Sequence, residues 1–128
     1  MPLLEGGTFR AAEAEGRVLV IYWWASWCPF CAEMSPHVEK LWREQRERGL
    51  VVLGISTDKT AAPAIAYRRR RDLTFPSVLH DAKMEPMLPK PKAVPTTWVR
   101  ARDGRVLEVI PGQMFPEDVA ELAKHLRG

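Results

Sequence analysis

The chain has 128 residues, of which 46% are apolar, and its 19 basic and 16 acidic residues give a net charge of +3. This length and apolar content suit one hydrophobic core, so we expect a single domain over residues 1–128. The only long apolar run, residues 18–25, is shorter than the ~20 residues that cross a bilayer, and no charged-then-apolar leader precedes it. We therefore expect neither a membrane span nor a signal peptide within these residues. The mild charge and the lack of a nucleic-acid-binding motif argue against a partner of that class.

The first half of the chain predicts a strand, a helix and a second strand. Residues 16–25 form a continuous β-branched and aromatic run, which is typical of a strand covered on both faces. Residues 29–48 are predicted to be a helix, because apolar residues recur there at helical spacing and Gly49 can end it. Residues 50–56 form a second buried run. Such a unit predicts two parallel strands joined by a right-handed crossover.

A charged helix and a short edge strand are expected next. Residues 61–72 are predicted to form a helix with a heavily charged outer face. The basic run 68–71 lies on it, and we interpret these arginines as a solvated helix surface rather than a binding patch. Residues 75–80 form a short segment that suits an edge strand, because Pro76 cannot donate a hydrogen bond to a neighbouring strand.

The last third combines a proline-rich loop, a hairpin and a helix. Residues 84–95 contain four prolines and cannot form a regular helix. Residues 96–101 and 105–110 flank a short Asp-Gly turn, so they predict a β-hairpin. A helix is expected from Pro116. Its predicted buried stripe consists of Val119, Leu122, Ala123 and Leu126.

The only two cysteines, Cys28 and Cys31, lie in the sequence Trp-Cys-Pro-Phe-Cys at the junction between the first strand and the first helix. Residues three apart on a helix share one face, about 5–6 Å apart at Cβ, so a small adjustment closes a disulfide. The positive end of the helix stabilises a thiolate at the first position. We therefore predict that Cys28 is the nucleophile and that Cys31 resolves the mixed disulfide formed on it.

Other uses of a cysteine pair are less compatible with this sequence. A structural zinc site needs four ligands, and the histidines His37, His80 and His125 are scattered without finger-like spacing, so no metal site is predicted. A disulfide between residues three apart closes too small a loop to act as a structural staple. A role in handing Cu(I) between thiolates stays open, since two sulfurs can suffice for that ion.

The segments "VLVIYWWASWCPFCAEMSP" and "AVPTTWVRARDGRVLEVIPGQM" resemble the thioredoxin superfamily, and within it the TlpA-like and ResA-like branch of bacterial periplasmic thiol:disulfide oxidoreductases. The resemblance covers roughly residues 16–128. It rests on several separate features, among them the tryptophan before the cysteine motif, Pro36 five residues after the second cysteine, and the Val-Pro-Thr-Thr run before the hairpin. It implies a thioredoxin-like α/β fold in which helices flank a central mixed β-sheet. It also places catalysis at Cys28 and Cys31.

Further site residues are implied by the same resemblance. Pro36 matches a helix-kinking proline, and Pro95 matches a cis-proline that faces the active-site disulfide. Val94 would then offer its backbone to an extended substrate segment. The predicted substrate-binding residues are Trp27, Pro29, Phe30, Val94, Pro95 and Thr96.

Two departures from the family pattern affect the prediction. Tyr22 stands six residues before Cys28, where thioredoxins proper carry a buried aspartate that relays a proton to the second cysteine. A tyrosine is a poor general base at neutral pH, so Asp58 or a water chain would have to replace it. The second departure is the proline-rich loop 84–95, where relatives often have a helix; it either shapes partner choice or acts as a rigid connector.

Together, these features predict a thiol:disulfide oxidoreductase that reduces protein disulfides and needs no cofactor beyond its redox-active cysteines. The resemblance implies apocytochrome c or metallochaperone cysteines as partners, a membrane electron donor upstream, and a monomer in the periplasm or another extracytoplasmic space. Alternatives are a disulfide-forming oxidase or isomerase, a cytosolic thioredoxin in the cytoplasm, and a non-catalytic copper-handling module. The Pro29-Phe30 dipeptide between the cysteines does not decide between reductant and oxidant.

Overall fold

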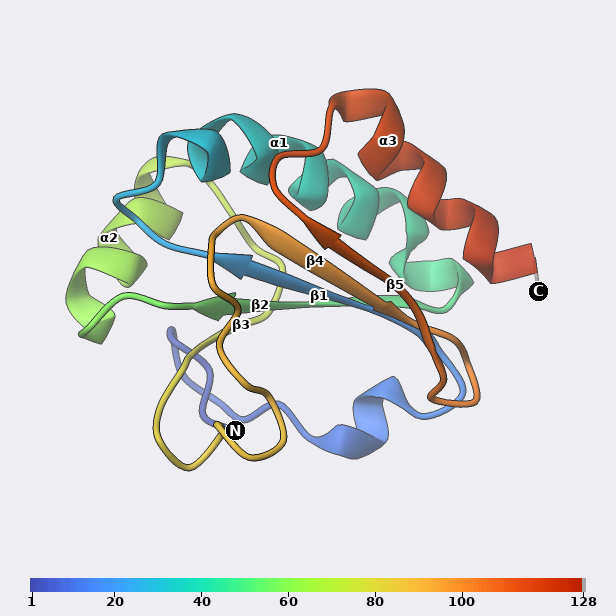
Figure 1. Cartoon of the computed structure of the whole chain (residues 1–128), viewed down its shortest axis with the longest axis horizontal. Coiled ribbons are helices and arrows are strands. Elements are labelled where there is room, and N and C mark those ends of the chain that lie inside the picture. The colour runs from blue at the N-terminus through green and yellow to red at the C-terminus, as the bar shows by residue number, and fades with distance from the viewer. Residues whose placement is uncertain (128) are drawn as a thin grey trace.

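A computed structural model describes residues 1–127 and contains a five-stranded mixed sheet with the strand order β3-β2-β1-β4-β5 (Figure 1). The strands are β1 (Val18–Trp24), β2 (Leu50–Ser56), β3 (Ser77–Leu79), β4 (Thr96–Arg100) and β5 (Val106–Pro111). The first three run parallel, whereas β4 is antiparallel to β1 and β5 is antiparallel to β4. The predicted α/β class with a central mixed sheet is confirmed.

Three α-helices accompany the sheet, namely α1 (Pro29–Gln45), α2 (Ala61–Arg70) and α3 (Pro116–Glu121). Short 3-10 turns cover Ala11–Ala14, Arg46–Arg48 and Leu122–Arg127. In Figure 1, α1 and α3 lie side by side over one face of the sheet, and the N-terminal segment lies beyond the other face. Within the described residues, no helix is both long enough and apolar enough to cross a membrane.

Two hydrophobic clusters, one on each face of the sheet, form the core. Alternate residues of β1, including Val18, Tyr22 and Trp24, pack with the three helices. The residues between them, such as Ile21 and Trp23, pack instead with the N-terminal segment and the proline-rich loop. All seven residues of β1 and all seven of β2 are buried. This explains why both strands appear in the sequence as continuous apolar runs.

The structure confirms most of the predicted elements and corrects their ends. The first helix stops at Gln45 and tightens into a 3-10 turn before Gly49, whose φ of 98° permits the reversal into β2. The second helix ends at Arg70 rather than at residue 72. The predicted C-terminal helix is α-helical only over Pro116–Glu121 and continues as a 3-10 helix.

Loop and edge predictions also agree with the structure. β3 is an edge strand of the sheet, although it covers only Ser77–Leu79 of the predicted segment. Residues 81–95 contain no helix or strand. β4 and β5 form the expected hairpin, with a register shift between Val99 and Arg100.

The interpretation of the basic run as a solvated surface is wrong for Arg68. Its side chain is buried, its Nε donates to the carboxylate of Glu5, and its Nη2 donates to the carbonyl of Phe75 at 2.7 Å. The guanidinium therefore ties α2 to the N-terminal segment and to the residues that lead into β3. Arg69, Arg70 and Arg71 are exposed as predicted.

Gly54 in the middle of β2 provides a stability prediction. A Cβ at this position would lie 2.7 Å from both Phe75 Cε1 and Ser77 Oγ, and 3.0 Å from Trp24 Nε1. These neighbours are packed, and the Trp24 indole donates to Ser77 at 3.0 Å. Gly54→Ala should therefore lower the free energy of unfolding by about 1–3 kcal/mol, the cost of overpacking a core, as measured by urea denaturation. An unchanged midpoint with an unchanged slope would contradict this packing.

Candidate active site

The two cysteines lie where β1 ends and α1 begins. Cys28 is the N-cap residue of α1, and Pro29 occupies the first helical position. The Cys28 sulfur accepts a hydrogen bond from the backbone N–H of Cys31 at 3.2 Å. A sulfur in this position receives the free N–H groups of the first helical turn, an arrangement that favours negative charge on it. Both cysteines are free thiols in this structure.

A distant part of the chain covers the Cys28 sulfur. The thiol donates to the carbonyl of Val94 at 3.6 Å, and the Val94–Pro95 peptide bond is cis, as the family resemblance implies. Thr96 follows as the first residue of β4, and its hydroxyl donates to the carbonyl of Ala93 at 2.7 Å. These contacts leave Cys28 only 3% exposed. The segment that carries Val94 therefore lies directly against the Cys28 sulfur.

The remaining predicted substrate-binding residues surround the cysteine motif. Trp27 is 68% exposed and Phe30 is 58% exposed, which is unusual for large aromatic side chains. Pro29 is also exposed. The structure thus brings the cysteine motif and the cis-proline segment together, with apolar side chains presented to solvent beside them. Such a surface suits a polypeptide better than a small polar molecule.

Cys31 differs from Cys28 in its surroundings. It is fully buried, and burial raises the pKa of its thiol, with a further increase from its hydrogen bond with Cys28. At neutral pH, Cys31 is therefore protonated. The division of roles between an attacking Cys28 thiolate and a resolving Cys31 thiol stays a prediction.

Tyr22, on β1, lies next to Cys31 in the core. Its hydroxyl donates to the Cys31 carbonyl at 3.2 Å and lies 2.9 Å from Ser35 Oγ, which in turn lies 3.2 Å from the Tyr67 hydroxyl. Burial raises the pKa of Tyr22 well above its ordinary value, and burial also raises the pKa of Tyr67. Neither hydroxyl ionises at neutral pH, so Tyr22 is no general base there.

Among the residues described, the Asp58 carboxylate bonds to Ser26 and Ser56 rather than to a cysteine. It accepts the backbone N–H of Ser26 at 3.2 and 3.1 Å, and it accepts the hydroxyls of Ser26 and Ser56, each at 2.6 Å. In the described part of the chain, it bonds to neither cysteine. Asp58 therefore holds the turn that leads into the cysteine motif, and the suggestion that it replaces the missing aspartate as a base gains no support.

Sequence reasoning missed several residues that complete the site. Ser35 and Tyr67 belong to the hydroxyl network. Ser35 precedes Pro36, which the family resemblance identified, but nothing in the sequence marks Ser35 itself as part of the site. The segment after β5 also closes onto the site: Gly112 donates its N–H to the Pro95 carbonyl at 2.8 Å, and Gln113 donates to Glu33 at 2.8 Å. These pairs join positions far apart in the sequence, which only the fold brings together.

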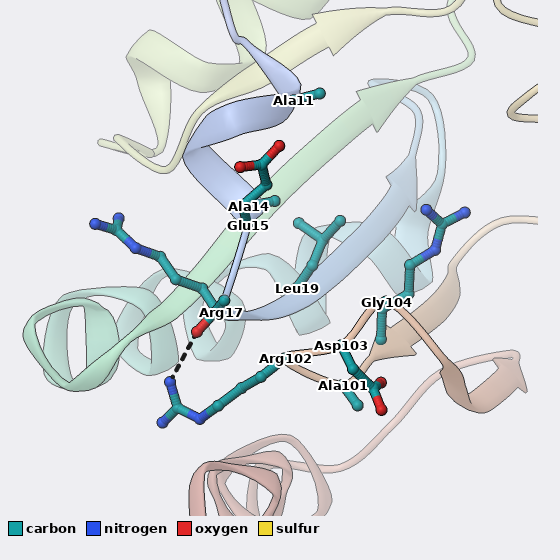
Figure 2. Close-up of a pocket in the computed structure, with 11 residues that line it drawn as sticks. Ala11, Ala14, Glu15, Arg17, Leu19, Ala101, Arg102, Asp103 and Gly104 are labelled. Atoms are coloured by element: carbon teal, nitrogen blue, oxygen red, sulfur yellow. Dashed lines mark hydrogen bonds between the residues drawn. The ribbon is translucent and has the colours of Figure 1, made fainter.

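A groove of about 300 Å³ lies at the other end of β1 from the cysteines, between the N-terminal segment and the turn of the β4–β5 hairpin (Figure 2). Figure 2 shows Arg102 extended along one side of it, where the guanidinium donates to the Gly16 carbonyl at 3.2 Å. The same guanidinium donates to the carbonyls of Arg48 and Leu126 at 3.4 and 3.2 Å. Arg102 thus links the turn before β1 to the 3-10 turn before β2 and to the C-terminal 3-10 helix. No cysteine lines this groove.

Residues 1–109 match the sequence profile of the AhpC/TSA family. The chain belongs to this family. The chain is also similar to proteins named thiol-disulfide oxidoreductase ResA, among them one from Oceanobacillus iheyensis, 30% identical over 112 residues, and one from Bacillus thuringiensis subsp. konkukian, 24% identical over 127 residues. The first match covers 87% of this chain and 58% of the relative, and the second covers 96% and 71%. The chain therefore spans less than two thirds of the O. iheyensis protein.

Solved structures of related proteins share the fold. A thiol:disulfide interchange protein of the thioredoxin family from Chlorobium tepidum superposes with a TM-score of 0.92 at 20% identity, covering 100% of this chain and 92% of that one. A secreted Mycobacterium tuberculosis disulfide oxidoreductase homologous to Escherichia coli DsbE has a TM-score of 0.77 at 21% identity, covering 98% and 92%. The predicted thioredoxin-like fold of this AhpC/TSA family member is confirmed.

Proposed function

We propose that this protein is a thiol:disulfide oxidoreductase that reduces protein disulfides through a Cys28–Cys31 dithiol/disulfide couple. The observation that carries the proposal is the position of the Cys28 sulfur, at the N-terminus of α1 and against the Val94 carbonyl, with the buried thiol of Cys31 one helical turn away. The relatives named thiol-disulfide oxidoreductase support it.

The reaction takes place in two exchanges. The Cys28 thiolate attacks one sulfur of a partner disulfide, so that a mixed disulfide forms and the other partner sulfur leaves as a thiolate. Cys31 then loses its proton and attacks the Cys28 sulfur. The Cys28–Cys31 disulfide forms, the second partner sulfur is released, and the partner leaves with two thiols. Two electrons pass from the protein to the partner, so no organic cofactor is required.

We assign partner binding to the surface around the sulfur. Trp27, Pro29 and Phe30 supply its exposed apolar part, and Val94, Pro95 and Thr96 supply an extended backbone segment. The Val94 carbonyl, which now accepts the Cys28 thiol, would instead accept an N–H from the partner. This arrangement favours an extended polypeptide whose disulfide reaches Cys28.

We further propose that the protein belongs to the TlpA-like branch and works in an extracytoplasmic compartment as a monomer. A structural relative from M. tuberculosis and another from Corynebacterium glutamicum are described as secreted, which supports this placement. Apocytochrome c and metallochaperone cysteines are the proposed partner classes, with reducing equivalents supplied by a membrane donor. A cytosolic thioredoxin, an oxidase or isomerase, and a copper-handling module are the alternatives to be tested.

Three measurements test the proposal. The reduced protein should accelerate insulin disulfide reduction by dithiothreitol while its own cysteine pair cycles. A redox titration should place the couple near −270 mV for a reductant, whereas a value near −120 mV would indicate an oxidant. Tight Cu(I) binding without any acceleration of insulin reduction would contradict the enzyme and favour the copper-handling module.

A further inference from the structure

The buried hydroxyls of Tyr22, Ser35 and Tyr67 form a hydrogen-bonded chain next to Cys31, in which the donor of each bond can be assigned. The Tyr22 hydroxyl has one proton, which it donates to the Cys31 carbonyl. Its contact with Ser35 must therefore use the Ser35 proton, and the contact between Ser35 and Tyr67 must use the Tyr67 proton. Tyr67 donates to Ser35, Ser35 to Tyr22, and Tyr22 to Cys31. Each link polarises the next, so the terminal O–H at Cys31 is strengthened as a donor.

This chain of three hydroxyls carries no net charge at neutral pH. Burial raises the pKa values of Tyr22 and Tyr67, and Ser35 does not titrate. The neighbours of Tyr22 on β2 and β4 are Gly54 and Thr97, which do not titrate either. The ionisable groups that face the chain are the two cysteines on α1 and Arg71, whose guanidinium stacks 4.7 Å over the Tyr67 ring.

Resolution of the mixed disulfide creates a problem at Cys31. The sulfur must become a thiolate in a fully buried position, where ionisation is costly without a hydrogen-bond donor. The Tyr22 hydroxyl is a side-chain donor close to this sulfur, because it already bonds to the backbone carbonyl of Cys31. Burial raises the pKa of Cys31; the backbone of Ala25 and, to a smaller extent, a hydrogen bond from Tyr22 oppose this increase.

We propose that Tyr22 is a positioning residue for the resolving step: its hydroxyl turns from the Cys31 carbonyl toward the Cys31 sulfur and stabilises the thiolate as it forms. The inference rests on the proposed function and deepens it. The Cys31 proton passes to the departing partner thiolate, the Cys28–Cys31 bond forms, and the bond between Cys28 and the partner breaks. A neutral hydroxyl chain thus performs by hydrogen bonding the task that a buried carboxylate would perform by accepting the proton.

Tyr22→Phe tests the proposal because it keeps the ring and removes only the hydroxyl. In single-turnover reactions with a peptide disulfide, formation of the mixed disulfide should be unchanged, while its resolution should slow about tenfold to a hundredfold, the effect of one hydrogen bond to a charged group. In a Cys28→Ser background, Tyr22→Phe should slow alkylation of Cys31 at pH 9 by a similar factor, because the thiolate is the reacting form.

Thr97→Val is the matched control. Thr97 lies opposite Tyr22 on β4, is buried, and its hydroxyl has no hydrogen-bond partner within residues 1–127. Its removal should change neither resolution nor alkylation. A loosened core would expose Cys31 and speed its alkylation, so the sign of the effect separates a hydrogen-bonding role from a packing role. Ser35→Ala should slow resolution of the mixed disulfide and alkylation of Cys31 less than Tyr22→Phe does.

The outcomes separate this inference from the proposed function. If the wild-type protein resolves mixed disulfides but Tyr22→Phe resolves them equally fast, the role of Tyr22 is refuted and the enzyme stands. If the wild-type protein reduces no disulfide, the proposed function fails. In that case slower Cys31 alkylation in Tyr22→Phe still supports the hydrogen bond, and unchanged alkylation refutes it.

Discussion

Cys28→Ser should reduce insulin disulfide reduction to the uncatalysed rate, because the serine hydroxyl supplies no thiolate at the N-terminus of α1. Cys31→Ser should have a different effect: the first exchange still takes place, and the partner stays bound through Cys28 as a mixed disulfide. Non-reducing gel electrophoresis followed by mass spectrometry of the linked peptides should find partner adducts on Cys28 alone. The difference follows from the full burial of Cys31 and from its raised pKa.

The order of alkylation gives an independent check of this division. At mildly acidic pH, a small alkylating reagent should label Cys28 before Cys31 in the reduced protein. The two single serine variants are matched controls for each other, since each removes one sulfur from the same helical turn. Faster labelling of Cys31, or stable adducts formed by Cys28→Ser, would reverse the assignment of nucleophile and resolving thiol.

Glu39→Ala should cause a large loss of stability. The buried Glu39 carboxylate, on α1, accepts the backbone N–H groups of Thr74 and Phe75 at 2.7 and 3.0 Å, the Thr74 hydroxyl at 2.5 Å, and the Arg43 guanidinium. Its removal leaves the buried N–H of Phe75 without its partner and removes the hydrogen bonds from the more exposed Thr74 and Arg43. We therefore expect the free energy of unfolding to fall by about 2–4 kcal/mol. Urea denaturation at pH 7 measures the loss. Glu44→Ala, at an exposed position of the same helix, should change it little.

The Glu39 contribution should also depend on pH. Burial alone raises the pKa of this carboxyl, but the hydrogen bonds from Thr74, Phe75 and Arg43 outweigh burial and lower its net pKa. A lowered folded-state pKa stabilises the protein above the unfolded value of about 4.3 and loses this contribution as pH falls through the folded value. The stability difference between wild type and Glu39→Ala should therefore shrink below about pH 4. A constant difference down to pH 2 would contradict this role.

Local sequence patterns were sufficient for the elements that surround the cysteines. The continuous apolar runs predicted β1 and β2 because both strands are buried on each face. The Asp-Gly turn predicted the hairpin because its geometry depends on neighbouring residues only. Cys28 and Cys31 could be placed at the start of α1 for the same reason. The meeting of Val94–Pro95 with Cys28 came only from the family resemblance, since no local rule brings those residues together.

Long-range polar contacts could not be predicted in this way. Arg68 belongs to a run of four arginines, and only its position on α2 relative to Glu5 and Phe75 makes it a buried partner. Ser35 and Tyr67 likewise carry no pattern that marks them as hydroxyls below Cys31. The C-terminal segment had the apolar spacing of a helix, and that spacing does not distinguish the α-helical turns from the 3-10 turns after Glu121.

The cover over the Cys28 sulfur has a consequence for oxidative damage. Overoxidation of a cysteine to sulfinic acid requires peroxide to reach the sulfur repeatedly, and it proceeds fastest at exposed thiolates. Cys28 is only 3% exposed and bonds to the Val94 carbonyl, so a diffusing oxidant should reach this sulfur more slowly than it would reach an exposed one. In the proposed binding mode, an extended polypeptide brings an N–H group that competes for that carbonyl and would uncover the sulfur. Overoxidation of Cys28 by peroxide should then be slower in the free protein than in one whose Val94 segment is displaced.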